Sequence, residues 1–223
     1  MDADFSAMRQ SIVDGAPESA SNLATQALAQ GRHPLEVIDA GFVPGMAEVG
    51  ELFAKHQMFL PDMLAAAEAM KAAMSILEPE LKRQGEERPV AGIVVLGTTK
   101  GDIHEIGKTL VGTLLTANGF KVHDLGVDVS CERFAETARE LNADIVGVSA
   151  LLTTTMRGQK SVVDALNQAG LRPTVKIIVG GAPVTQRWAE EIGADGYAKD
   201  AMSAVALVKS LLARKVAPAE MTL

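Results

Sequence analysis

The stretch AGIVVLGTTKGDIHEIGKTLVGTLLTANGFKVHDLG, residues 91–126, changes its hydrophobic period twice. The continuous apolar run at 91–98 predicts a buried strand, and residues 106–119 have the length and spacing of a helix that Gly119 closes. A second short apolar run at 120–126 predicts the next strand. A strand, a helix and a strand in this order predict one parallel βαβ unit.

The same alternation continues to residue 213. We predict further strands at 143–150, 176–181 and 195–199 and helices at 131–142, 156–169, 185–192 and 201–213, with Ser130 capping the first of these helices. This alternation predicts an α/β domain with a five-stranded parallel sheet, Rossmann-like or flavodoxin-like, in the order 2-1-3-4-5. Ligands of such sheets lie outside the carboxyl ends of the strands, where we expect the following segments to converge: 98–105, 149–155, 180–185 and 199–201.

The N-terminal part has a helical period. Helices are predicted near 3–14 and 18–30, and a third begins at Pro34 with a kink or break expected around Pro44 and its neighbouring glycines. A fourth helix begins at Pro61, and its apolar stripe contains Met63, Ala67, Met70, Met74, Leu77 and Leu81. We therefore predict a four-helix bundle at 1–84, a linker at 85–90, and the α/β domain at 91–223.

Composition and charge exclude several classes of protein. The chain has 223 residues and a formal net charge of -7, which argues against nucleic-acid and anionic-membrane partners. A single cysteine, Cys131, is typical of a reducing compartment. The start MDADFSAMRQ has no apolar core of a secretory signal, and no apolar run is long enough to span a bilayer. We expect a cytoplasmic protein.

The segment TTKGDIHEIGKTL, residues 98–110, superficially resembles a phosphate-binding loop. A P-loop has four residues between its glycines, whereas five separate Gly101 from Gly107, and Asp102 would repel a phosphate from inside the cradle. We therefore reject nucleotide hydrolysis on this loop. A phosphate-accepting receiver domain is also rejected, because the strand end VSALLT lacks the required aspartate.

Asp102 and His104 suggest a metal site. A histidine that binds a metal usually gives its second ring nitrogen to a carboxylate. One histidine and one aspartate cannot hold zinc, and no other cluster supplies ligands, so a metal that arrives already chelated by a tetrapyrrole-type cofactor suits the pair better. The alternative is that His104 only caps a helix or bonds a carbonyl, and the spacing alone leaves both open.

The wider sequence resembles the cobalamin-binding signature of corrinoid proteins, which is D-x-H-x-x-G followed by S-x-L and G-G. The matching residues are Asp102-Ile103-His104-Glu105-Ile106-Gly107, Ser149-Ala150-Leu151 and Gly180-Gly181. Residues 43–79 also resemble the helical cap that precedes this domain in cobalamin-dependent methionine synthase. Together the two parts are similar to the stand-alone methyl-carrying corrinoid protein of a multi-component methyltransferase system.

The resemblance implies a cobalamin or related corrinoid, methylcobalamin in the loaded state, with His104 as the cobalt ligand. Asp102 would hold the other ring nitrogen, and a hydroxyl of Ser149, Thr153 or Thr155 would complete the relay. Phe53, Leu60 and Met63 would cover the upper face of the cobalt. The remaining implied cofactor-binding residues are Gly101, Glu105 and Gly107 near the corrin, Leu151 of the S-x-L motif, Gly180 and Gly181 along the nucleotide tail, and Ala201 beside the buried base.

The resemblance also implies the function of a non-catalytic subunit. Such a protein carries a methyl group between a substrate-specific methyltransferase and a second methyltransferase that acts on a thiol or folate, and a reductive activator serves it. Methylamines, methanol, betaines and aryl methyl ethers are all open as methyl donors. The alternative is a cobalamin-dependent sensor or regulator, which usually carries a cap tryptophan, whereas Trp188 lies in the predicted sheet domain. The helical cap disfavours a third possibility, the small subunit of a mutase.

Overall fold

A computed structural model describes residues 3–85 and 90–216 of the chain. The chain divides into two compact units, residues 1–89 and 90–223. Most of the predicted linker at 85–90 and the last seven residues, 217–223, lie outside the described residues. In the part that the structure describes, no helix combines the length and apolar composition that a membrane crossing requires.

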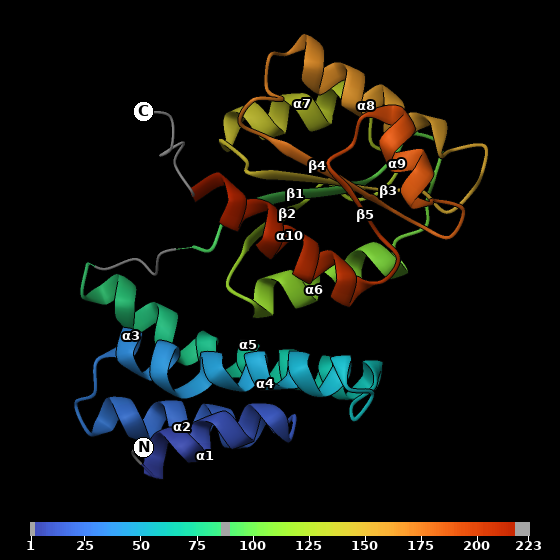
Figure 1. The fold of residues 1–223 in the computed structure, drawn as a ribbon. Helices are drawn as coiled ribbons and strands as arrows, with labels where there is room; N and C mark the ends of the chain where they lie inside the picture. Colours follow the sequence, from blue (N-terminus) through green and yellow to red (C-terminus); the bar gives the residue numbers. More distant parts are fainter. Residues whose placement is uncertain (1–2, 86–89, 217–223) are drawn as a thin grey trace, which may run out of the picture. The chain divides into compact units, whose positions relative to one another are not determined.

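The first unit is helical, as predicted (Figure 1). Its elements are α1 (Ala3–Val13), α2 (Pro17–Ala29), α3 (Pro34–Glu36), the π-helical segment η1 (Val37–Phe42), α4 (Val43–Ala54) and α5 (Leu60–Arg83). Large side chains from α1, η1, α4 and α5 form its core, among them Met8, Phe42, Met46 and Met70. The buried residues of α2 are all alanines, as are half of those of α5, and side chains this small let two helices pack closely.

The kink expected around Pro44 takes the form of a π-helical segment and not of a break. The Val43 N–H donates to the Ile38 carbonyl, five residues earlier. Buried positions in this stretch recur every four residues, at Pro34, Ile38, Phe42 and Met46. The wider π turn keeps such a spacing on one face better than an α-helix, whose period is 3.6 residues. A Cβ on Gly45 would lie 2.7 Å from the Ile12 Cβ, so this glycine serves packing against α1.

The second unit contains the predicted parallel sheet, in the order β2-β1-β3-β4-β5. Its strands are β1 (Ile93–Thr98), β2 (Lys121–Asp124), β3 (Ile145–Ser149), β4 (Lys176–Gly180) and β5 (Gly196–Ala198). Its helices are α6 (Ile106–Ala117), α7 (Cys131–Glu140), α8 (Arg157–Gln168), α9 (Gln186–Ile192) and α10 (Ala201–Val216). In Figure 1, α6 and α10 cover one face of the sheet and α7 and α8 cover the other.

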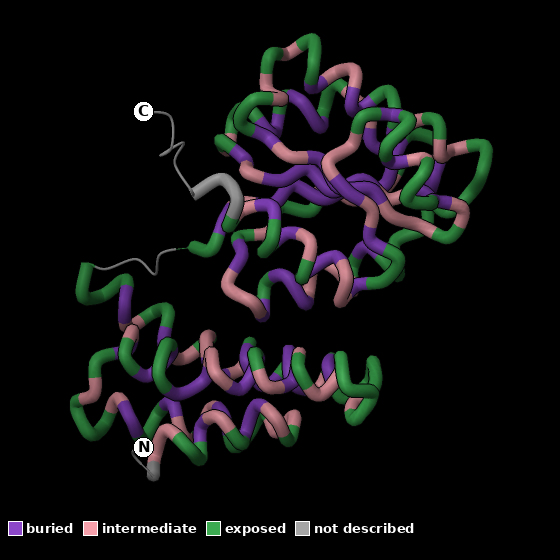
Figure 2. The backbone as a smooth tube through the Cα atoms, viewed as in Figure 1, coloured by how far each residue is buried: buried purple, intermediate pink, exposed green. Residues whose placement is uncertain are grey.

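The central strands are almost wholly buried, as Figure 2 shows in purple. Val95, Val146 and Ile177 of β1, β3 and β4 belong to one core cluster with Phe134 of α7. Burial on both faces explains why these strands appear in the sequence as continuous apolar runs. The Ser130 cap is confirmed, because the Ser130 Oγ accepts a hydrogen bond from the Arg133 N–H at 3.3 Å.

Candidate functional site

The strand ends lie in register at the carboxyl edge of the sheet. Thr98 pairs with Ser149, Ser149 with Gly180, and Gly180 with Ala198. The loops that follow β1, β3, β4 and β5 therefore leave the sheet at the same level. This register brings together the segments that the sequence predicted to converge, and it places the Asp102 and His104 loop beside the loop that follows β3.

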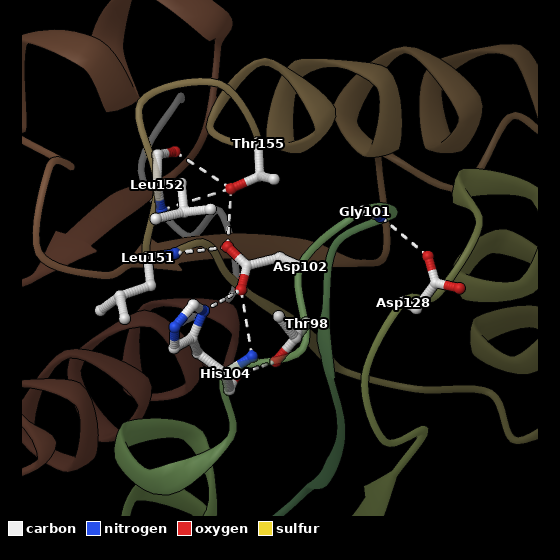
Figure 3. A network of polar contacts seen from close by, with 8 residues as sticks. All are labelled: Thr98, Gly101, Asp102, His104, Asp128, Leu151, Leu152 and Thr155. Atoms are coloured by element: carbon white, nitrogen blue, oxygen red, sulfur yellow. Dashed lines mark hydrogen bonds and ion pairs between the residues drawn. The ribbon is translucent and has the colours of Figure 1, made fainter.

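Asp102 is the centre of a polar network at this edge (Figure 3). Its side chain is completely buried. Its Oδ1 accepts from the His104 Nδ1 at 2.7 Å and from the His104 backbone N–H at 3.1 Å. Its Oδ2 accepts from the Thr155 hydroxyl at 2.6 Å and the Leu151 N–H at 2.7 Å. Burial opposes ionisation, but the hydrogen bonds from Thr155, Leu151 and His104 outweigh it and hold the pKa of Asp102 well below its ordinary value.

His104 presents its second ring nitrogen away from this carboxylate. Because an ionised carboxylate only accepts hydrogen bonds, Nδ1 carries a proton, and in the neutral form of the ring Nε2 then keeps its lone pair. The side chain is 46% exposed, and the Thr98 hydroxyl donates to the His104 carbonyl at 2.9 Å. The helix-cap alternative does not hold, since Glu105 is the N-cap residue of α6 and the ring bonds a carboxylate. The arrangement is that of a metal-binding imidazole with a fixed tautomer.

The structure chooses among the three hydroxyls that the sequence left open. Thr155 is the residue that reaches Asp102, and its hydroxyl oxygen also accepts from the Leu152 N–H at 3.3 Å. Among the described residues, no hydrogen bond joins Asp102 to Ser149 or Thr153. The relay in this chain is therefore Thr155, Asp102 and His104, assembled from two loops.

Large apolar side chains are exposed around the histidine. Ile103 is 75% exposed and Ile106 is 88% exposed, and Leu151 and Leu152 of the loop after β3 are also exposed. We call these four residues the apolar rim. Contiguous exposed apolar residues commonly mark a ligand site. Among the described residues, no group of three or more His, Cys, Asp or Glu side chains is placed to hold a metal ion by itself.

Two glycines of the motif, Gly107 and Gly181, differ in whether the surrounding chain leaves room for a side chain. A Cβ on Gly107, in the first turn of α6, would meet no atom within 4 Å, so nothing in the chain requires this glycine and the space above it is open. Gly181 has a φ of 127°, and a Cβ there would lie 1.8 Å from the Ala150 carbonyl oxygen. Gly181 is thus required by the chain itself. Room for a nucleotide tail at Gly180 and Gly181 stays a prediction.

The other predicted site residues come from both units. Met63 is buried in the core of the helical unit, whereas Leu60 at the start of α5 is exposed and Phe53 is partly exposed. Phe59, which the sequence analysis did not single out, is 65% exposed, more than any other large apolar residue among the described residues of that unit. Ala201 is buried at the start of α10, and Glu105 is exposed beside His104.

The residues that suggested a phosphate loop have a structural role. Lys108 is buried in α6 and forms an ion pair with Asp124 at the end of β2. The Asp124 carboxylate also accepts from the Gly126 N–H at 2.9 Å. The Lys108 ammonium is therefore committed within the chain, in agreement with the rejection of a nucleotide site.

The fold and site define a class of protein: a parallel α/β domain that presents a carboxylate-bound histidine beside an exposed apolar rim, together with a helical unit. Two family models, each described as a B12 binding domain, match residues 92–206 and 5–78. The chain belongs to this family of B12-binding proteins. A cobalamin or related corrinoid is therefore its cofactor, and the free Nε2 of His104, the apolar rim and the open space at Gly107 fit a broad ligand that carries a metal.

Named relatives support the assignment. Dimethylamine corrinoid protein 2 of Methanosarcina acetivorans is 50% identical over 182 residues, 82% of this chain and 84% of the relative. Trimethylamine corrinoid protein 2 of Methanosarcina mazei is 48% identical over 204 residues, 92% of this chain and 94% of the relative.

Solved structures are similar as well. A cobalamin-binding protein from Desulfitobacterium hafniense matches with a TM-score of 0.74 and 33% identity, covering 93% of this chain and 98% of that one. The methanol:cobalamin methyltransferase complex MtaBC from Methanosarcina barkeri contains a chain that matches with a TM-score of 0.85 and 28% identity, covering 95% of this chain and 80% of that one.

Proposed function

We propose that this chain carries a methyl group on the cobalt of a bound corrinoid, from a substrate-specific methyltransferase to a second methyltransferase. The observation that carries the proposal is the relay of Thr155, Asp102 and His104, which leaves a lone pair on Nε2 at the carboxyl edge of the sheet. When bound, the corrinoid supplies a cobalt centre that accepts and releases the methyl group.

The chain's own residues would control the ligand beneath that centre. His104 would bind the cobalt through Nε2, while Asp102 holds the Nδ1 proton and fixes the tautomer. Since the pKa of Asp102 is lowered by hydrogen bonds that outweigh burial, the proton of the pair stays on Nδ1. The apolar rim would keep water away from the bound corrinoid around His104.

The partners are proposed from the relatives. Two relatives are dimethylamine and trimethylamine corrinoid proteins, and a similar solved chain belongs to a methyltransferase complex. We therefore propose a substrate-specific methyltransferase for a methylamine as the donor side. A second methyltransferase that acts on a thiol or folate, and a reductive activator, would complete the system. The single cysteine supports a cytoplasmic location.

The upper-face residues are part of the proposal. Leu60 and Phe53 would cover the upper face of the cobalt, and the exposure of Leu60 and its neighbour Phe59 supports this role. Met63, which is buried, would support them from the core of the helical unit. An apolar cover of this kind would keep water from the methylated cobalt.

The test is reconstitution of the purified full chain with hydroxocobalamin. We expect stoichiometric corrinoid and, after reduction to Co(II), an electron paramagnetic resonance signal with coupling to one histidine nitrogen. His104→Ala removes that coupling, and His123→Ala, which changes an exposed histidine of β2, leaves it unchanged. Failure of the wild-type chain to retain corrinoid, or an unchanged signal in His104→Ala, overturns the proposal.

A further inference from the structure

Asp128, in the loop between β2 and α7, contacts the loop that carries Asp102 and His104 (Figure 3). Its carboxylate accepts from the Gly101 N–H at 2.8 Å and from the Lys100 ammonium at 3.1 Å. Its own N–H donates to the Asp102 carbonyl at 2.9 Å. One residue therefore binds three consecutive residues of the neighbouring loop.

The backbone of Asp128 is in the left-handed region, with a φ of 56°. Few residues other than glycine adopt this conformation, and aspartate and asparagine are among those that tolerate it best. Here it lets the N–H and the carboxylate of one residue face the same loop. The next residue fixes the segment further, because the Val129 N–H donates to the Thr98 carbonyl at 2.9 Å and Val129 forms a parallel bridge with Thr99.

Asp102 is consequently held from two sides by two different loops. The loop after β3 binds its side chain through Leu151 and Thr155. The loop after β2 binds its main chain through Asp128. Gly101, which precedes Asp102, has a φ of 80°. Glycine has the most conformational freedom of all residue types, and the Asp128 carboxylate on its N–H restricts that freedom here.

We infer that Asp128 is a positioning residue, whose carboxylate fixes Gly101 and thereby sets where the Asp102 carboxylate meets the His104 ring. The inference deepens the proposed function and rests on it for the corrinoid. The hydrogen bond to Gly101 carries the role, since the pair with Lys100 is between exposed side chains and such pairs contribute little. Acceptor geometry is therefore needed and negative charge is not.

Three substitutions at Asp128 separate geometry from charge. Asp128→Asn keeps an acceptor oxygen and a residue that tolerates positive φ. Asp128→Gly keeps the backbone conformation and the N–H bond to Asp102 but removes the carboxylate. Asp128→Ala removes the carboxylate and also strains the backbone. Lys100→Ala is the matched control, because it removes only the exposed ion pair.

Two readouts are needed in the full chain. In the cofactor-free protein, two-bond proton-nitrogen correlations report how far Nδ1 of His104 is the protonated nitrogen, with His104→Ala assigning the signals. In the corrinoid-loaded protein, the Co(II) signal reports the fraction of cobalt with a histidine nitrogen. We expect the equilibrium constant for binding of His104 to the cobalt to fall about 10-fold in Asp128→Gly and Asp128→Ala. Loss of a residue that supports a metal ligand typically has an effect of this size. In Asp128→Asn and Lys100→Ala this equilibrium constant should stay within about 2-fold of the wild-type value.

The outcomes are distinguishable. If Asp128→Gly keeps the wild-type tautomer and the wild-type ligation, the carboxylate has no positioning role and the inference is wrong, whatever the corrinoid does. If Asp128→Asn falls as far as Asp128→Gly, charge and not geometry carries the effect, which also overturns it. If the wild-type chain binds no corrinoid, the proposed function fails, while the tautomer measurement still tests Asp128. Circular dichroism and urea unfolding establish that each variant is folded.

Discussion

Two aspartates lie at opposite edges of the same sheet, and both are largely buried. At the amino edge, Asp195 accepts from the Ile177 N–H at 2.7 Å and from the Arg172 guanidinium at 2.5 Å, and Lys176 lies 3.5 Å away. At the carboxyl edge, Asp102 accepts from one hydroxyl, two backbone N–H groups and the His104 ring.

The difference lies in where each network ends. Asp195 is paired with Arg172 and Lys176, and Arg172 also donates to the Val175 and Gly193 carbonyls, so that network closes within the chain. The network of Asp102 ends on an imidazole whose far nitrogen is free to bind a ligand. We expect a network that closes within the chain to serve stability, and a network that ends on an open ring nitrogen at the ligand edge of the sheet to serve function.

The largest effect is expected at the amino edge. Arg172→Met leaves Asp195 without its main cation and should lower the free energy of unfolding by about 2–3 kcal/mol, because removing one partner of a largely buried pair is costly. Urea unfolding measures it. Corrinoid retention should not change, and a variant that loses corrinoid but keeps its stability would contradict the division between the edges.

At the carboxyl edge, Asp102→Asn should lower corrinoid affinity about 10- to 100-fold, since an amide cannot accept from all the present donors and no longer fixes the ring tautomer. Asp195→Asn is the matched control, with a loss of stability and unchanged affinity. Titration with hydroxocobalamin distinguishes the two. Equal losses of affinity in both variants would show that the comparison is wrong.

A third aspartate, which among the described residues shares no hydrogen bond with either network, calibrates the pH dependence of stability. Asp200 precedes α10, where its carboxylate accepts from the Ser203 N–H at 2.7 Å. Burial opposes ionisation, but the bonds from Ser203 outweigh it and lower the pKa of Asp200. Asp200→Ala should cost about 1 kcal/mol at pH 7, as loss of a helix cap does.

The sign of this dependence follows from the lowered pKa. The contribution is present above the unfolded aspartate pKa, about 3.9, and is lost as pH falls through the lower folded value. Urea unfolding of Asp200→Ala and wild type should therefore converge in acid. A constant difference across this range would exclude the carboxylate as the cause.

The smallest effect has opposite signs in the two states. Gly107→Ala should raise the stability of the cofactor-free chain by about 0.5 kcal/mol, because alanine is the better helix former, yet weaken corrinoid binding by filling open space. Gly112→Ala in the same helix is the control: its Cβ would lie 3.5 Å from Leu96, an ordinary contact, so it should stabilise without affecting corrinoid. Thermal unfolding and titration of both variants test this.

Much of the fold could be predicted because strand and helix periods differ so clearly. The parallel sheet followed from strict alternation, the expected order 2-1-3-4-5 is confirmed, and the convergence at the carboxyl edge followed from parallel strands. The pairing of Asp102 with His104 was also accessible, since residues two apart on one loop can meet. The π-helical segment was not, although the spacing of four between its buried residues was visible in the sequence.

The rest of the site depends on loop conformations that no local pattern specifies. Ser149, Thr153 and Thr155 are equivalent hydroxyls in the sequence, and only the path of the loop after β3 brings Thr155 to Asp102. Asp128 comes from a loop distant in sequence, and its role depends on a positive φ that aspartate adopts only in context. The demand for Gly181 likewise comes from the Ala150 carbonyl on another segment.

The exposed apolar rim has a consequence for the turnover of the protein in the cell. A chain loaded with corrinoid would bury these side chains, whereas a newly made chain presents them to chaperones, proteases and other copies of itself. Binding stabilises the folded state by mass action, so the supply of cofactor would set how much carrier survives. Cofactor scarcity would then reduce the amount of the protein as well as its loading.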